Sequence, residues 1–221
     1  MILESLLTTI TDLRFMAFVV PTKDSFREMY AHCAPWDIGR PQKEFVDAEA
    51  QMKGSILDAG CGTGENALYF AQRGHAVTGI DFLEEPIERA QQKSAERKIK
   101  ATFQVQDALR LGDLHQQFDN AIDSGLFHTF TDEQRPQYVA GLAQVLKPGG
   151  KLFLMCFSDK EPGDMGPRRI SQSELRSAFS KGWQIESIKE THFEITKNLP
   201  PNMQFSPGGP FAWFAVIQRQ P

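Results

Sequence analysis

Long hydrophobic runs, basic clusters and paired cysteines are all missing from this sequence. The longest apolar run near the N-terminus, residues 15–20, is far shorter than the roughly 20 residues that cross a bilayer. No stripe of lysine and arginine is present to meet a phosphate backbone, and the net charge is −4. The cysteines Cys33, Cys61 and Cys156 are widely separated, which fits a reducing compartment. We therefore expect a cytoplasmic protein with no nucleic-acid partner, no membrane partner and no metal.

The N-terminal segment also lacks the features of a signal peptide. Residues 1–20 carry Glu4, Asp12 and Arg14, begin without basic residues and contain no small-residue cleavage site. We expect a lid helix or a loose tail there, and Met16 remains open as an alternative start.

From residue 54 onward, short apolar runs alternate with helical patterns. Strands are predicted at residues 55–58, 75–80, 101–105, 118–122, 151–157, 183–189 and 211–219. Helices are predicted at residues 65–73 and 86–98 and after two capping boxes, Thr131-Asp-Glu-Gln134 and Ser171-Gln-Ser-Glu174. Pro148-Gly149-Gly150 is expected to end the helix that follows the first box. Repeated strand–helix–strand units favour right-handed crossovers and a mostly parallel sheet.

The length of 221 residues suits one domain. We expect residues 1–53 to cover the binding site and residues 54–157 to form the ligand-binding core. Residues 158–221 are expected to supply the substrate side and the final strands.

The most informative motif is the turn Leu57-Asp-Ala-Gly-Cys-Gly-Thr-Gly64, between a predicted strand and a predicted helix. Its glycines permit a tight turn and a close approach of a ligand to the backbone. The spacing Gly60-x-Gly62-x-Gly64 differs from the GxGxxG of dinucleotide enzymes, in which a helix N-terminus receives a pyrophosphate. Asp58 before the turn and Glu65 after it disfavour a doubly charged phosphate. A ligand that carries an ammonium group fits better.

Acidic residues follow the next strands in turn. Asp81 ends the second strand, where a carboxylate can accept hydrogen bonds from both hydroxyls of a ribose. After the third strand, Asp107 can accept the exocyclic amine of an adenine and the Ala108 amide can face a ring nitrogen, although Asp107 could equally cap a helix. The fourth strand leads into Asp123-Ser-Gly-Leu-Phe-His128, at the edge where α/β sheets bind ligands.

Together these motifs resemble the class I S-adenosylmethionine-dependent methyltransferases over residues 54–157. The resemblance implies an α/β, Rossmann-like, seven-stranded and mostly parallel sheet, with one antiparallel strand near the C-terminus and helices on both faces. It implies S-adenosyl-L-methionine as the cofactor, with its methionine end at the glycine turn and near Asp123, its ribose on Asp81 and its adenine at Asp107. The predicted cofactor residues of the core are Asp58, Gly60, Cys61, Gly62, Gly64, Asn66, Asp81, Phe82, Asp107, Ala108, Asp123 and Ser124.

A narrower resemblance lies in Ala34-Pro-Trp-Asp-Ile-Gly-Arg-Pro41. It is similar to the segment that precedes the glycine turn in small-molecule methyltransferases of the thiopurine, halide/thiol and tellurite type. This resemblance implies that Trp36 packs on the cofactor, where an aromatic face beside a sulfonium would gain about 0.5–2 kcal/mol. A core anchor between lid and sheet is the alternative role of Trp36. Arg40 is expected nearby and could pair with the methionine carboxylate.

The acceptor side has weaker signals. His128 is the tentative catalytic residue, because an ordinary imidazole pKa of about 6.5 suits a general base, while shaping the pocket is the alternative. Arg168 could bind an acidic substrate or face water. Seventeen phenylalanines against three tyrosines make the expected cover apolar. The predicted acceptor-side residues are Phe127, His128, Arg168, Phe205 and Trp213.

The predicted reaction is methyl transfer by in-line displacement to a small molecule: a thiol, halide, phenol or heterocycle nitrogen. Such a transfer needs alignment more than functional groups. The (N/D)PP(Y/F/W) motif of enzymes that methylate base or amide amines does not follow the fourth strand, and Asn198-Leu-Pro-Pro-Asn202 lies elsewhere. We expect a monomer or a homodimer. The alternatives are a non-catalytic S-adenosylmethionine-binding protein, a macromolecular methyltransferase and a nicotinamide oxidoreductase, which the turn spacing disfavours.

Overall fold

The computed structural model describes residues 22–32, 34–199 and 203–221, and our predictions for residues 1–20, Met16 and Cys33 lie outside these ranges. The helices are α1 (Lys23–His32), α2 (Lys43–Ala48), α3 (Glu65–Gln72), α4 (Glu84–Arg97), α5 (Gln134–Val145) and α6 (Gln172–Ala178). The strands are β1 (Ser55–Ala59), β2 (Ala76–Asp81), β3 (Thr102–Val105), β4 (Phe118–Ser124), β5 (Leu146–Phe157), β6 (Trp183–His192) and β7 (Phe211–Arg219). Three short 3₁₀ helices are η1 (Glu49–Gln51), η2 (Ala108–Leu114) and η3 (Phe127–Thr129).

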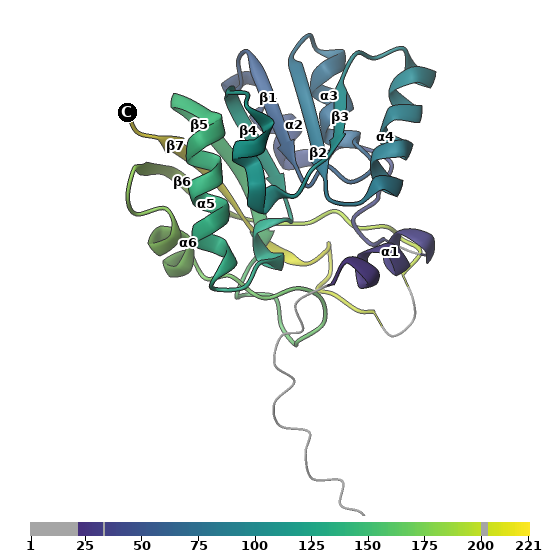
Figure 1. Cartoon of the computed structure of the whole chain (residues 1–221). Helices are drawn as coiled ribbons and strands as arrows, with labels where there is room; N and C mark the ends of the chain where they lie inside the picture. Colours follow the sequence, from purple (N-terminus) through teal and green to yellow (C-terminus); the bar gives the residue numbers. More distant parts are fainter. Residues whose placement is uncertain (1–21, 33, 200–202) are drawn as a thin grey trace, which may run out of the picture.

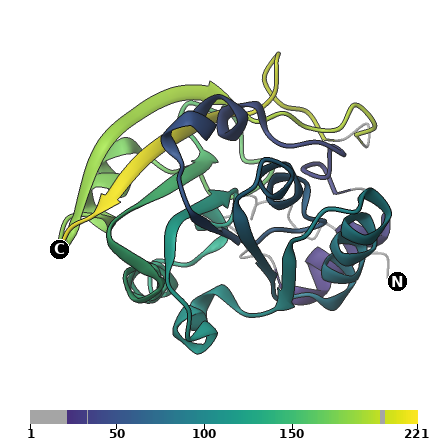
Figure 2. The same cartoon turned by 90° about the horizontal axis from the view of Figure 1, so that it is seen from above.

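All seven strands form one sheet in the order β3-β2-β1-β4-β5-β7-β6 (Figure 1). Neighbouring strands from β3 to β5 are parallel, whereas β7 runs antiparallel to both β5 and β6. The predicted mostly parallel sheet with one antiparallel strand near the C-terminus is confirmed. The view from above shows that the sheet ends in the curved pair of strands β6 and β7 (Figure 2).

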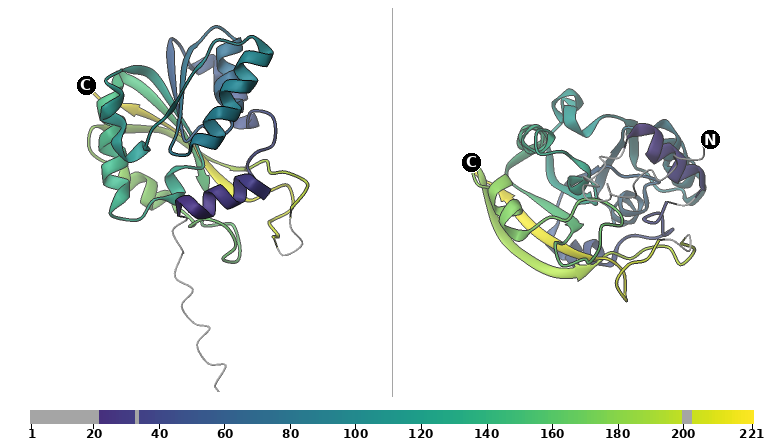
Figure 3. Two further views of the ribbon diagram at one scale, coloured as in Figure 1. Left: turned by 45° about the vertical axis from the view of Figure 1, so that its right-hand side comes forward. Right: turned by 90° about the horizontal axis from the view of Figure 1, so that it is seen from below.

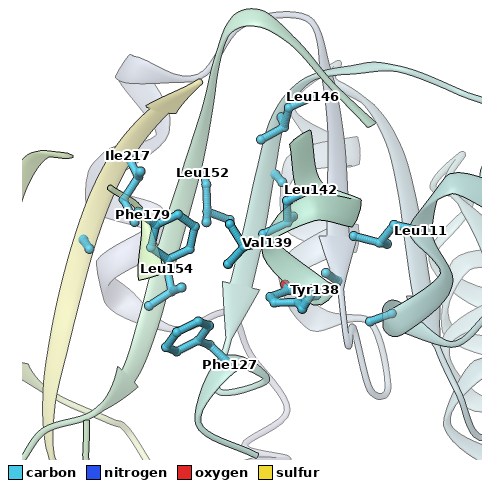
Figure 4. Close-up of a cluster of buried hydrophobic side chains, with 14 of the residues drawn as sticks. Leu111, Phe127, Tyr138, Val139, Leu142, Leu146, Leu152, Leu154, Phe179 and Ile217 are labelled. Carbon is cyan, nitrogen blue, oxygen red and sulfur yellow. The ribbon is translucent and has the colours of Figure 1, made fainter. Parts of the chain in front are cut away.

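Helices cover both faces of the sheet, as predicted. On one face α2, α3 and α4 bury side chains such as Phe45, Leu68 and Ile87 against the strands. On the other, η2, α5 and α6 contribute Leu111, Tyr138 and Phe179 (Figure 4). Burying a large apolar side chain contributes about 1.5–3 kcal/mol, which explains why the central strands are nearly continuous apolar runs.

Both predicted capping boxes form. Thr131 N–H donates to Gln134 Oε1 at 3.0 Å and Gln134 N–H donates to Thr131 Oγ1 at 3.2 Å, and Ser171 and Glu174 make the same reciprocal pair. The end of α5 is earlier than predicted, because Leu146 already pairs with Phe118 of β4. The prediction that the strand starts at residue 151 was therefore wrong; β5 starts at Leu146, on the far side of the Pro-Gly-Gly turn.

The carboxyl edge of the parallel strands is covered by segments from distant parts of the sequence. Figure 3 shows α1 and the chain that follows β6 on this edge. Phe26 and Tyr30 of α1 pack there against Phe82 and Leu83, which follow β2. The crossovers after β1 and β4 lead to opposite ends of the sheet order, so the covered edge includes the switch point where α/β sheets bind ligands. Within the described ranges, no helix has the length and apolar character to span a membrane.

Candidate cofactor and acceptor site

Two positions of the turn after β1, those of Gly62 and Gly64, require glycine. Gly62 and Gly64 have φ angles of +52° and +84°, in the left-handed region. A Cβ atom on Gly62 would lie 2.7 Å from the Tyr30 hydroxyl, and one on Gly64 would lie 2.8 Å from Ala90 Cβ. The backbone of this turn is therefore pressed between α1 on one side and α4 on the other.

Asp81 ties the glycine turn to the end of β2. Its Oδ2 accepts the Gly62 N–H at 3.1 Å and its Oδ1 accepts the Leu83 N–H at 3.0 Å. Burial raises the pKa of Asp81, and the two backbone amides oppose that rise. One carboxylate thus fixes the turn and at the same time lines the neighbouring cavity.

A cavity of about 570 Å³ lies at the covered edge of the sheet, within the size range of small-molecule sites. A smaller hollow of about 50 Å³ adjoins it and shares Trp36, Gly60 and Ser124 with it. The predicted residues that line the large cavity are Trp36, Gly60, Asp81, Phe82, Asp107, Ala108, Ser124, His128 and Phe205. Those that line the hollow also include Arg40, Cys61, Gly62, Gly64 and Asn66.

Two predicted cofactor residues lie behind the cavity wall instead of in it. Asp58 is fully buried, and neither of its carboxylate oxygens has a hydrogen-bond partner among the described residues. Burial raises its pKa to about 8. Asp123 is also fully buried and accepts the Leu126 and Phe127 amides and the Tyr138 hydroxyl. Asp123 therefore shapes the turn after β4, and the structure does not bring it into contact with the cavity.

Two further predicted residues have partners within the protein. The Arg40 guanidinium forms an ion pair with the Glu194 carboxylate, with 2.7 Å between Nη1 and Oε2. We had expected this guanidinium to pair with the methionine carboxylate of the cofactor. Asp107 accepts the Leu109 N–H at 2.9 Å and so caps η2, the alternative role foreseen for it, while still lining the cavity.

Three predicted acceptor-side residues lie outside both cavities. Phe127 is fully buried in the core beside Phe179, because η3 turns its side chain away from the edge. Arg168 pairs with Asp132 and Glu174. The Trp213 indole donates to the Ile170 carbonyl at 2.9 Å and stays within the core. These three expectations are corrected by the packing of α5 and α6.

The residues of α1 that face the cavity were not among the predicted site residues. The cavity is lined by Phe26, Met29 and Tyr30. Met29 and Tyr30 follow Phe26 by three and four positions, so the three side chains lie on one helix face. Trp36 Nε1 donates to the Tyr30 hydroxyl at 3.1 Å, and the Trp36 ring meets Phe26 edge-on at 5.8 Å. This apolar spacing was the available signal for a lid helix.

His128 is 6% exposed and lines the cavity near the end of β4. Its Nδ1 accepts the Phe157 N–H at 2.9 Å, and its ring meets Phe157 and Phe193 edge-on. Burial, together with the positive charges of Arg169 and Arg135, lowers the pKa of His128 to about 3. The imidazole is therefore neutral.

These features fit S-adenosylmethionine. The glycine turn offers backbone without side chains, and Trp36 presents a ring beside the hollow. Within the described part of the chain, no three His, Cys, Asp or Glu side chains gather as a metal ion would need. The fold and this edge together have the arrangement of a class I methyltransferase.

Comparison with known proteins agrees. A family model described as a methyltransferase domain matches residues 56–150. The chain is 37% identical over 166 residues to 2-heptyl-1-hydroxyquinolin-4(1H)-one methyltransferase of Mycobacteroides abscessus, covering 73% of both chains. It is 28% identical over 170 residues to probable thiol methyltransferase 2 of Arabidopsis thaliana, covering 75% of both.

The structure also resembles solved structures. One of them, from work on the conversion of a disulfide bond into a thioacetal group during echinomycin biosynthesis, has a TM-score of 0.79 to this chain. That similarity includes 33% identity and covers 90% of this chain and 93% of the other. The chain belongs to the S-adenosylmethionine-dependent methyltransferases, and S-adenosylmethionine is its cofactor.

Proposed function

We propose that this enzyme methylates an apolar, aromatic small molecule at an oxygen or sulfur atom. The observation that carries the proposal is the wall of the large cavity away from the glycine turn, which is formed mainly by aromatic, methionine and isoleucine side chains. These are Phe26, Met29, Phe130, Phe157, Phe193, Ile195, Met203 and Phe205. Each Å² of apolar ligand surface covered by such a wall gains about 25 cal/mol.

The cofactor-binding residues are proposed from their positions. The methionine end would lie in the small hollow against Gly60 and Gly62, and Asp81 would accept the ribose hydroxyls. Phe82 and Ala108 would enclose the adenine. When bound, S-adenosylmethionine supplies the methyl group and leaves as S-adenosylhomocysteine. The chain itself contributes alignment and the exclusion of water, which are the main requirements of an in-line displacement.

The size and character of the cavity favour some of the predicted acceptors over others. A halide ion would leave most of the apolar wall in contact with water, whereas a ring compound would cover it. The names of two relatives support this choice: one acts on a hydroxyquinolone with a heptyl chain, and the other is a probable thiol methyltransferase. Phenols, aromatic thiols and N-hydroxy heterocycles are therefore our preferred acceptors.

A substrate panel tests the proposal. The purified chain would be incubated with S-adenosylmethionine and, separately, 2-heptyl-1-hydroxyquinolin-4(1H)-one, thiophenol, phenol and iodide, with methylated products identified by mass spectrometry. We expect methylation of the aromatic compounds and little of iodide. The proposal fails if S-adenosylhomocysteine binds but iodide is the only compound of the panel that is methylated.

A further inference from the structure

One nitrogen of the His128 ring is already committed to the backbone. Nδ1 lies 2.9 Å from the Phe157 amide nitrogen, and a backbone N–H can only donate. Nδ1 is therefore an unprotonated acceptor. A neutral imidazole carries one proton, so in His128 that proton is on Nε2.

A second proton on this ring is strongly opposed. The charged groups that act on His128 are the guanidinium of Arg169, which lies 5.6 Å from the centre of the Phe157 ring, and that of Arg135. Both are positive, and the ring is enclosed by Phe157 and Phe193. An imidazolium would also direct an Nδ1 proton at the Phe157 N–H. The neutral form with the proton on Nε2 therefore persists throughout the neutral pH range.

The other nitrogen is near the point where the two cavities meet. A Cβ atom built on Gly125 would lie 3.5 Å from His128 Nε2 and 3.3 Å from Cε1. Gly125 lines the large cavity, and its neighbour Ser124 lines both the cavity and the hollow. Nε2, in contrast to Nδ1, makes no hydrogen bond to another described residue.

The carboxylates that line the cavity are engaged elsewhere. Asp81 accepts the Gly62 and Leu83 amides, Asp107 accepts the Leu109 amide, and Glu194 pairs with Arg40. The Tyr30 phenol is buried and accepts the Trp36 indole proton, and burial raises its pKa well above the ordinary value. These groups do not provide a free base next to His128.

We propose that His128 donates a hydrogen bond from Nε2 to the acceptor and thereby selects acceptors that enter as anions: thiolates and the ionised forms of acidic hydroxyls. This inference rests on the proposed function. The acceptor loses its proton to solvent before it binds. Its lone pair then forms the bond to the methyl carbon, and the electrons of the broken carbon–sulfur bond stay on sulfur. No proton is transferred to the protein in this step.

The protonation state can be measured without turnover. Protein labelled with ¹⁵N in its histidine rings would be examined by NMR at neutral pH, with and without S-adenosylhomocysteine. We expect the shifts of a neutral ring protonated on Nε2 and not on Nδ1. A His128 ring that is protonated on Nδ1, or that titrates near neutral pH, would overturn the proposal.

Two substitutions separate donation from general-base catalysis. His128→Gln keeps an N–H donor near the position of Nε2 but cannot act as a base, whereas His128→Phe keeps the ring shape and loses the donor. With 2-heptyl-1-hydroxyquinolin-4(1H)-one as acceptor, we expect His128→Phe to lower kcat/KM about 10- to 100-fold and His128→Gln to lower it much less. His75→Gln, at the opposite edge of the sheet, is the matched control.

The pH profile provides the second readout. With para-substituted thiophenols of graded acidity, the rise of kcat/KM with pH should move with the pKa of each thiol. The result that would indicate a general base has two parts. His128→Gln and His128→Phe would lose equal amounts of kcat/KM, and the pH profile would follow the pKa of one enzyme group, whichever thiol is used. If His128→Phe does not fold, the NMR shifts and the thiol series still decide. If no aromatic acceptor is methylated while S-adenosylhomocysteine binds, the proposed function fails and the protonation state remains a separate result.

Discussion

The side-chain amide of Gln42 makes both of its hydrogen bonds to the backbone of one residue, Glu194. Gln42 Nε2 donates to the Glu194 carbonyl at 2.8 Å, and the Glu194 N–H donates to Gln42 Oε1 at 2.9 Å. The two hydrogen bonds have the pattern of a pair in a β-ladder, with the side-chain amide of Gln42 in place of a backbone amide. Gln42 is 4% exposed, so this pairing lies inside the protein. It fastens the segment after α1 to the segment after β6, and the Thr196 N–H continues the contact with the Pro35 carbonyl at 2.9 Å.

Replacing Gln42 with alanine should loosen this cover. Gln42→Ala leaves the partly buried N–H and carbonyl of Glu194 without these partners, so we expect a loss of about 1–3 kcal/mol in the free energy of unfolding. Urea denaturation and hydrogen exchange of the Glu194 amide would measure the effect. Gln51→Ala, on an exposed glutamine, is the control, and identical behaviour of the two variants would contradict the prediction.

Asp81 offers a direct test of cofactor binding. Asp81→Ala removes the carboxylate that we place on the ribose, and hydrogen bonds to a charged acceptor contribute about 1.5–3 kcal/mol each. We therefore expect the affinity for S-adenosylhomocysteine, measured by calorimetry, to fall at least about tenfold. Asp113→Ala, on an exposed acid of η2, should leave it unchanged. Undiminished binding by a folded Asp81→Ala protein would rule out the ribose role.

The two buried carboxyls should make stability depend on pH. Burial raises the pKa of Asp58 to about 8 and of Asp123 to about 6, whereas an unfolded aspartate titrates at about 4. Between these values the folded state binds more protons than the unfolded state. The stabilisation is thus complete below about pH 4 and declines as the pH rises through about 6 and 8.

Asp58→Asn should flatten the alkaline part of this curve in urea denaturation without cofactor. Asp119 provides a control of opposite sign, because the hydrogen bond from Lys147 lowers its pKa to about 2. Asp119→Asn should change only the acid part of the curve, below about pH 4, where a lowered pKa loses its stabilising effect. Equal slopes above pH 6 in Asp58→Asn and the unaltered protein would refute the assignment.

The apolar wall can be probed at Phe205, whose ring meets Phe157 edge-on at 5.9 Å. Phe205→Ala should raise KM for an aromatic acceptor about tenfold, since burying a phenylalanine-sized surface contributes about 1.5–3 kcal/mol. The affinity for S-adenosylhomocysteine should stay the same. Phe211→Ala is the matched control, because Phe211 is partly buried to a similar degree but lies outside the cavity. A change in cofactor affinity without a change in KM would place Phe205 on the wrong side of the site.

The cofactor edge could be predicted from the sequence because its groups follow strands directly. In a parallel sheet the residue after each strand arrives at the same edge, so the order of Gly60, Asp81 and Asp107 along the chain is also their order in space. The sheet itself was predictable for a related reason. Strands buried on both faces are continuous apolar runs, which can be recognised in the sequence even when the neighbouring strands are not known.

The acceptor wall could not be predicted in the same way, because tertiary contacts decide which side chains face it. Phe127 begins the short helix η3 and Phe130 directly follows it, yet only Phe130 lines the cavity. Asp123 holds the amide of Phe127 and so rotates that ring into the core. The same holds for Arg168, whose acidic partner Glu174 belongs to α6. Local spacing does not contain this information.

Gln42 and Glu194 are 152 positions apart, and this separation sets an order of events during synthesis. The glycine turn and strands β1–β5 are all translated before residue 194. The part of the cover that α1 supplies is therefore translated first, and the part that follows β6 is added only near the end of translation. A chain that stopped before β6 would contain Asp81 and Asp107 but would lack the part of the cavity wall formed by Phe193, Ile195, Met203 and Phe205.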